Sequence, residues 1–115
     1  MSPAADIALE RDGGALIARL RGEIDMTNAS FVREELTSAV PNDAHALVID
    51  LDGTRYLDSA AIEVLFELSR RLGRRRQELR LVVSATSPLR RLLTLTDVGS
   101  VAPMYESLAE ALDGA

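Results

Sequence analysis

The sequence predicts an α/β fold: a mostly parallel sheet of four to five strands, with an N-terminal antiparallel hairpin and about four helices. Two segments of alternating apolar and polar residues flank the turn sequence Asp12-Gly13-Gly14, which is typical of a β-hairpin. Strand and helix patterns then follow in the order β-β-α-β-α-β-α-β-α, which favours parallel strands joined by helices. The segment from His45 to Leu51 is apolar without alternation, as in a strand that is covered on both faces.

The first half of the chain supplies the hairpin, one helix and the apolar strand. Alternation predicts strands from Ile7 to Arg11 and from Ala15 to Ile24. A helix is expected from Asn28 to Ala39, with Thr27 or Asn28 as its N-cap and Pro41-Asn42-Asp43 as its stop. Its apolar stripe is predicted at Phe31, Val32, Leu36, Ala39 and Val40.

The second half begins with the strongest helix pattern. After the strand that ends at Leu51, we expect a short connector that carries Tyr56 and Leu57, and then a helix from Ala60 to about Arg75. The apolar spacing predicts that this helix buries Ile62, Leu65, Phe66, Ser69 and Leu72.

Three shorter elements are predicted near the C-terminus. A strand is expected from Glu78 to Ser84, and Ser87-Pro88 is a helix start that should be ended by Gly99. We expect Leu89, Leu92, Leu93 and Thr96 to face inward. Val101 to Tyr105 suits an edge strand because of Pro103, and Ser107 with Glu110 predicts a capping box for a last helix through Leu112.

The composition excludes several function classes. The 115 residues suit one domain, so we expect a single domain over residues 1–115, structured from about residue 5 to about residue 112. The net charge of −5 argues against sequence-independent binding of nucleic acid, so no direct nucleic-acid partner is expected. The chain has no Cys, which excludes disulfides and thiolate chemistry, and it has no Lys.

The N-terminal sequence indicates the compartment. It shows no basic segment followed by an apolar one, so no signal peptide is expected. No apolar run approaches the roughly 20 residues that cross a bilayer. We therefore expect a cytoplasmic protein without membrane insertion.

The pair Asp58-Ser59, directly before the strongest helix, is the main candidate for function. Both residue types cap helices, because their oxygens accept hydrogen bonds from the free N–H groups of a first turn. The functional interpretation is that Ser59 is exposed at a strand-to-helix junction and can carry a phosphate there. Ser59 does not suit a hydrolase nucleophile, because the single histidine, His45, begins a strand at the opposite edge of the sheet. No catalytic residue is therefore assigned.

Two charged clusters carry weaker signals. Four acidic residues follow strands or precede the helix (Asp25, Asp50, Asp52 and Asp58), so metal binding stays open, although we assign no metal and no cofactor. Five arginines gather between Arg70 and Arg76, where cations offset the dipole at the end of a helix. The alternative is a docking patch for a partner or an acidic surface. No aromatic residues interleave with these arginines, so base stacking is unsupported.

Three sequence features together resemble the STAS domain of the anti-sigma-factor-antagonist type, over nearly the whole chain. The first is Gly22-Glu23-Ile24-Asp25 before a helix. The second is Leu47-Val48-Ile49-Asp50-Leu51, followed by Tyr56-Leu57-Asp58-Ser59. The third is Leu81-Val82-Val83, then Ser87-Pro88-Leu89-Arg90-Arg91-Leu92-Leu93, then Val98-Gly99. The resemblance implies a STAS-type single domain that acts as a regulatory binding module and not as an enzyme.

The resemblance also implies partners and site residues. Such antagonists bind an anti-sigma factor that is also a GHKL-type serine kinase, and this capture frees the sigma factor. Phosphorylation at the Asp-Ser junction breaks the capture, and a serine phosphatase restores it. Ser59 is thereby the phosphoacceptor, and a homodimer is left open. The implied pocket and partner-binding residues are Asp25, Thr27, Asn28, Asp58, Ala60, Ala61, Ile62, Ser84, Thr86 and Ser87.

The chain departs from the family pattern at one point. The usual junction is Asp-Ser-Ser/Thr-Gly, whereas this chain has Ala60 and Ala61 after Ser59. Only one hydroxyl is left for phosphorylation. Two alternatives therefore stay open: a STAS scaffold or transport-complex subunit that works without serine switching, and a small-ligand or metal-binding α/β domain that uses the acidic cluster.

Overall fold

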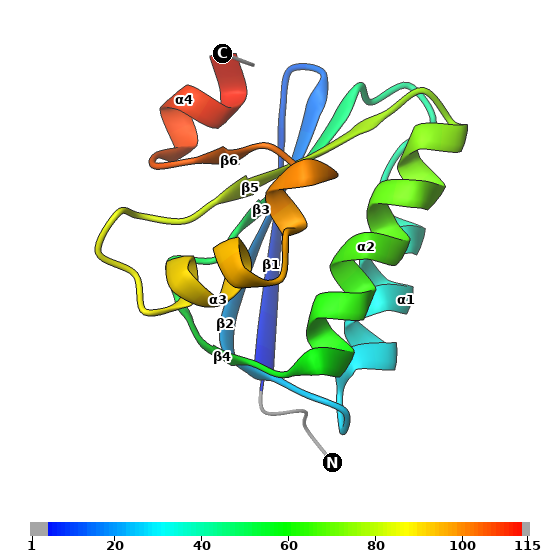
Figure 1. Cartoon of the computed structure of the whole chain (residues 1–115). Coiled ribbons are helices and arrows are strands. Elements are labelled where there is room, and N and C mark those ends of the chain that lie inside the picture. Colours follow the sequence, from blue (N-terminus) through cyan, green and yellow to red (C-terminus); the bar gives the residue numbers. More distant parts are fainter. Residues whose placement is uncertain (1–4, 114–115) are drawn as a thin grey trace.

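A computed structural model describes residues 5–113 as a sheet with helices on both faces (Figure 1). The strands are β1 (Ala5–Asp12), β2 (Ala15–Ile24), β3 (Ala46–Asp50), β4 (Thr54–Leu57), β5 (Glu78–Val82) and β6 (Met104–Tyr105). The helices are α1 (Ala29–Ala39), α2 (Ser59–Arg74), α3 (Leu89–Leu95) and α4 (Leu108–Asp113), with a 3₁₀ turn, η1, at Val98–Ser100. The predicted α/β class, hairpin and four helices are confirmed within the described residues, but the sheet there has six strands and not the predicted four to five.

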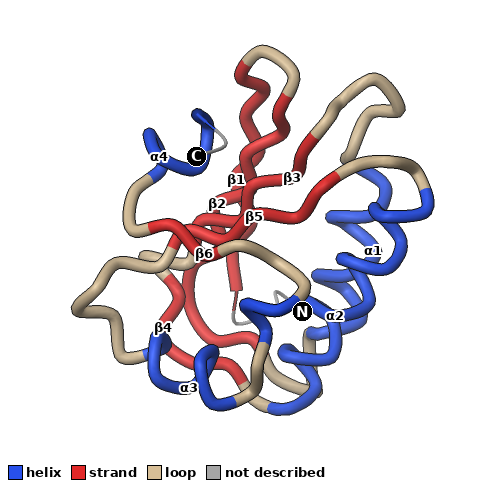
Figure 2. Tube along the Cα trace, turned by 45° about the horizontal axis from the view of Figure 1, so that its top comes forward, coloured by secondary structure: helices blue, strands red, loops and turns tan. Residues whose placement is uncertain are grey.

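The sheet has the strand order β1-β2-β3-β5-β6, in which only the β1–β2 pair is antiparallel (Figure 2). One edge of the long strand β2 pairs with β1. Its other edge pairs first with β3 and then with β4. Gly22 lies opposite both Ala5 and Thr54, at a register shift where its φ of 97° is one that glycine adopts without strain.

Strand β4 was not predicted, since the sequence indicated only a connector there. Its four residues are buried at the two ends, Thr54 and Leu57, and exposed between them. This pattern has no alternation, so no period-of-two signal marks it. β4 pairs with the end of β2, which continues beyond its last pair with β3, Arg19 with Asp50. It places Asp58 directly at the start of α2.

Two apolar layers hold the helices to the sheet. The larger packs α1, α2 and α3 against one face, and the smaller packs α4 against the other, as Figure 1 shows for α1, α2 and α4. The core is aliphatic, as the sequence requires. Its largest fully buried side chains are Ile17, Leu36, Leu47, Ile49, Leu51, Leu68, Leu79, Leu81, Leu93, Val32, Val48 and Val82.

The predicted helix stripes need correction at several positions. In α1, Val32 and Leu36 are buried, but Phe31 is 45% exposed. In α2, the predicted Phe66 and Ser69 are only partly buried, while Val64 and Leu68 are buried instead. Helix α2 contacts both α1 and the sheet. Its buried face is therefore wider than the single apolar stripe that the helical periodicity predicts. Ile62, Leu65 and Leu72 are buried as predicted.

The last third of the chain differs from prediction mainly at element ends. Helix α3 ends at Leu95 and not at Gly99, because Asp97 adopts a left-handed φ of 62° and a 3₁₀ turn follows. Only Met104–Tyr105 of the predicted edge strand pairs with β5. In the predicted capping box, Ser107 Oγ accepts from the N–H of Glu110 at 3.2 Å, whereas the Glu110 carboxylate accepts from Glu106.

Gly73 allows a stability test of α2. It lies exposed in the last turn, and a Cβ added there meets no heavy atom within 4 Å. We expect Gly73→Ala to raise the free energy of unfolding by about 0.5–1 kcal/mol, because alanine loses less conformational entropy on entering a helix. Urea denaturation monitored by circular dichroism measures the change. A lower midpoint would contradict the open geometry at this position.

Candidate functional site

The Asp58 carboxylate joins the start of α2 to the loop between β2 and α1. Its Oδ1 accepts a hydrogen bond from the N–H of Ala61 at 3.0 Å, which caps the helix as predicted. Its Oδ2 accepts from the N–H of Met26 at 2.9 Å. Because both oxygens are engaged, Asp58 fixes the position of Ser59 relative to the β2–α1 loop.

Ser59 is exposed and lies beside an open hollow of about 430 Å³, which we call the Ser59 hollow. Apolar side chains form much of its wall, and its only charged residues, Asp58 and Glu63, are both acidic. Tyr56 is 51% exposed at its rim. The complete lining is Tyr56, Leu57, Asp58, Ser59, Ile62, Glu63, Leu92 and Thr96.

The β2–α1 loop is held by hydrogen bonds inside the loop. Asp25 Oδ1 accepts from the N–H of Thr27 at 2.9 Å and also from its hydroxyl. Asn28 is buried, with its Oδ1 accepting from the N–H of Asp25 and its Nδ2 donating to the carbonyl of Glu23. Asn28 precedes α1, but its side chain makes no capping bond to it. The buried Asn28 side chain therefore stabilises the loop from its inner side, while Thr27 is exposed.

The hydroxyl of Thr27 influences the pKa of Asp25, two residues earlier in the chain. Hydrogen bonds from the side chain and then the backbone of Thr27 lower the pKa of Asp25. We expect Thr27→Val to raise the pKa of Asp25 toward its ordinary value, and Thr27→Ser to leave it low. An NMR titration of the Asp25 carboxyl measures both.

The same change alters the pH dependence of stability. Because the folded pKa of Asp25 is lowered, its contribution is present above the ordinary carboxyl pKa and is lost as the pH falls through the lowered value. The stability difference between wild type and Thr27→Val should therefore shrink with falling pH through that window. A difference that stays constant across it would contradict the role of the Thr27 hydrogen bond.

Ser84, Thr86 and Ser87 line a different hollow. It has a volume of about 370 Å³ and shares no lining residue with the Ser59 hollow. The Ser87 hydroxyl accepts from the N–H of Leu89 at 3.1 Å, so it serves the start of α3. The structure thus places the three hydroxyl residues near the other end of β4 and not in the hollow beside Ser59. The complete lining is Asp52, Thr54, Arg55, Ser84, Thr86, Ser87 and Pro88.

The acidic residues that suggested a metal site do not converge. Asp25 and Asp58 bind N–H groups near the start of their helices, while Asp50 accepts from the N–H of Asp52 and Asp52 accepts from that of Ser84. Within residues 5–113, no group of three or more His, Asp or Glu side chains could hold a metal ion. His45 lies exposed directly before β3, as predicted.

The sequence interpretation missed two apolar residues of the surface around Ser59. Met26 is 79% exposed and, with Ala60 and Glu63, lines a third hollow of about 170 Å³ between α1 and α2. Leu92, expected to face inward, is only partly buried and lines the Ser59 hollow. An apolar Met inside a polar turn was the available signal for the first. Ala61 and Ile62 are buried, and of the two Ile62 lines the Ser59 hollow.

The fold and the exposed Asp58–Ser59 junction define an α/β domain with a polar helix start set among apolar side chains. A family model for the STAS domain matches residues 6–111, and the chain belongs to this family. One relative is "Anti-sigma-F factor antagonist RsfB" of Mycobacterium tuberculosis, 29% identical over 102 residues that cover 88% of this chain and 81% of that protein. The relatives bear the names of regulatory antagonists and not of enzymes, in agreement with the predicted non-enzymatic role.

Solved structures agree with this placement. An anti-sigma factor antagonist from Mycobacterium paratuberculosis superposes with a TM-score of 0.84 at 27% identity, covering 96% of this chain and 92% of that one. The Bacillus cell fate determinant SpoIIAA in its phosphorylated form has the same fold, with a TM-score of 0.67 at 19% identity, over 95% of this chain and 98% of that one. In the part of the chain that the structure describes, no helix is long and apolar enough to span a membrane.

Proposed function

We propose that this protein is an anti-sigma-factor antagonist that captures an anti-sigma factor with GHKL-type serine kinase activity and thereby releases a sigma factor in the cytoplasm. The observation that supports this most is the exposed Ser59, placed by Asp58 beside an apolar hollow. Exposed apolar side chains within a polar rim mark protein-binding sites. Met26 and Tyr56 are such side chains: Tyr56 lines the Ser59 hollow, and Met26 lines the adjacent hollow that contains Ala60.

Capture depends on the neutral state of Ser59. The charged residues of the Ser59 hollow, Asp58 and Glu63, are both carboxylates. A phosphate at Ser59 adds roughly −1.5 to −2 charges beside them, and Glu63 lies four residues along the same helix. The hollow lining offers no arginine to compensate. We propose that phosphorylation of Ser59 ends the capture and that a serine phosphatase restores it.

A reconstitution tests the capture itself. Each anti-sigma factor encoded in the same genome is mixed with the full chain, and binding is measured by isothermal titration calorimetry with ADP or ATP present. We expect one of them to bind and to release its sigma factor in a size-exclusion experiment. Failure of every candidate to bind the unphosphorylated chain would overturn the proposal.

A second candidate function is supported by Ala60 and Ala61. They stand where the family pattern has a second hydroxyl and a glycine, and Ala61 is buried against the core. A scaffold or transport-complex subunit needs no switching serine. The same reconstitution separates the two functions, because a scaffold would bind no anti-sigma factor and release no sigma factor.

A further inference from the structure

The far end of α2 carries a concentrated positive surface in a chain of net charge −5. All five of its arginines are exposed: Arg70, Arg71, Arg74, Arg75 and Arg76, which we call the basic end of α2. Arg75 binds the side-chain oxygen of Asn42 at 2.6 Å. No carboxylate among the described residues forms an ion pair with any of the five, whereas Arg11, Arg19 and Arg33 are paired.

Arg76 occupies a backbone position that favours glycine. The N–H of Arg76 donates to the carbonyl of Gly73, and the N–H of Gln77 donates to that of Leu72, which is the Schellman ending of a helix. Arg76 has a φ of 58°, a left-handed conformation that is strained for a residue with a Cβ. Glycine would adopt this conformation without strain. The presence of arginine there indicates that its side chain has a functional role.

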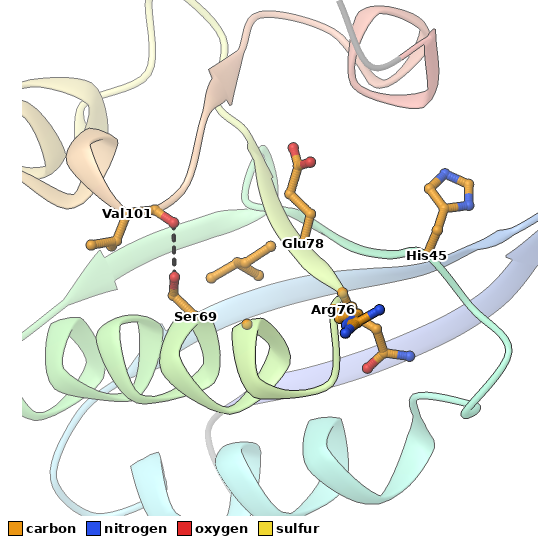
Figure 3. Close-up of a pocket in the computed structure, with 8 residues that line it drawn as sticks. His45, Ser69, Arg76, Glu78 and Val101 are labelled. Carbon is orange, nitrogen blue, oxygen red and sulfur yellow. Dashed lines mark hydrogen bonds between the residues drawn. The ribbon is translucent and has the colours of Figure 1, made fainter.

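An open hollow of about 500 Å³ lies beside this helix end. Arg76 lies at the junction of α2 and β5, with Glu78 and His45 pointing away from α2 (Figure 3). Glu78 is the only carboxylate in the lining, and Arg80 donates to it at 3.1 Å. Among the lining residues, Arg76 is therefore the cation that has no ion pair, and the other four arginines of the basic end precede it in the chain without lining the hollow.

We propose that the basic end of α2 is a second docking surface, which binds an acidic segment of a partner protein. A protein occupant fits better than nucleic acid, because no Phe, Tyr or Trp lines the hollow for base stacking and a chain of net charge −5 repels a polyanion as long as a nucleic acid. Carboxylates pair with guanidinium groups in fixed, bidentate geometry. Opposed charges of this kind supply partner choice and association rate.

The second surface is separate from the Ser59 hollow. The 16 residues of α2 span about 24 Å, so the two surfaces lie at opposite ends of one helix. The distance exceeds the Debye length of about 8 Å at physiological ionic strength, which leaves the basic end electrostatically independent of the phosphate at Ser59. The inference therefore does not rest on the proposed function.

A peptide of ten glutamates, labelled with a fluorophore, serves as the probe for the full chain in fluorescence anisotropy. We expect Arg70→Gln/Arg71→Gln/Arg74→Gln to weaken its binding about tenfold or more, because three exposed cations are removed. The matched variant Arg21→Gln/Arg55→Gln/Arg91→Gln removes the same charge from exposed sites elsewhere and should change binding less than about threefold. Raising salt from roughly 0.1 M to roughly 1 M should abolish wild-type binding.

The variant Arg76→Gly distinguishes a role of the Arg76 side chain in peptide binding from an effect on folding stability. It should weaken glutamate-peptide binding while raising the midpoint of urea denaturation, since glycine relieves the left-handed strain. Equal losses in the two triple variants, no binding of the peptide by wild type, or tighter binding of a duplex DNA or of phosphatidylserine vesicles would each overturn the proposal. Unchanged peptide binding by Arg76→Gly would remove Arg76 from the surface.

Discussion

Incubation of the full chain with ATP and the anti-sigma kinase that it binds is expected to add a single phosphate, and Ser59→Ala is expected to take none. Ser59 is exposed at the first position of α2, and neither following residue carries a hydroxyl. Asp58 fixes the position of this junction through its bonds to Ala61 and Met26. Intact-mass spectrometry counts the phosphates, and peptide fragmentation locates them.

A charge at Ser59 should also weaken capture strongly. We expect Ser59→Asp to weaken the anti-sigma factor complex by about 100-fold or more, because a buried like-charge contact costs several kcal/mol. Ser38→Asp adds the same charge to an exposed serine in the last turn of α1 and should leave the affinity unchanged within about threefold.

Two outcomes would contradict the Ser59 prediction. Phosphate that persists in Ser59→Ala would place the acceptor elsewhere. Phosphate that appears only in Ala60→Ser would show that the kinase needs a hydroxyl at the second position of the junction, which this chain lacks. In that case wild type would be a permanently active antagonist.

Asp58→Ala is expected to lower the free energy of unfolding by about 1–3 kcal/mol, because it removes a helix cap and leaves two N–H groups without their acceptor. The affected groups are Ala61 N–H in α2 and Met26 N–H in the neighbouring loop. Chemical denaturation measures the loss, and amide hydrogen exchange should become faster at both positions.

The isosteric variant Asp58→Asn distinguishes the two bonds. Asparagine caps helices as well as aspartate does, so protection of Ala61 should remain. Its amide offers a donor where Met26 needs an acceptor, so protection of Met26 should fall. If Asp58→Ala exchanged as slowly as wild type at both amides, Asp58 would not link the loop to the helix.

Local signals explain why much of the fold could be predicted from sequence. The turn chemistry of Asp12-Gly13-Gly14 and the alternation after it locate the hairpin, and β2 has the predicted bounds Ala15–Ile24. The apolar run before Leu51 indicates a central parallel strand, and Asp58 with its following apolar spacing indicates the start of α2. These features depend on residues that lie close together in the sequence.

Other features depend on contacts between distant segments. Strand β4 exists because β2 continues past Gly22, and Phe31 is exposed because α1 buries only the face that meets the sheet and α2. The local periodicity of the sequence does not determine which distant segment a side chain contacts.

The candidate site divides in the same way. The sequence by itself determined the hydroxyl at Ser59, its carboxylate neighbour and the missing second hydroxyl, because these are matters of residue identity. Only the tertiary structure decided that Asp58 reaches across to Met26 and that Arg76 ends α2 in a left-handed conformation. The physical reason is that hydrogen bonds across 32 residues and the dihedral angles of a helix end are set by packing, which the order of residues does not display.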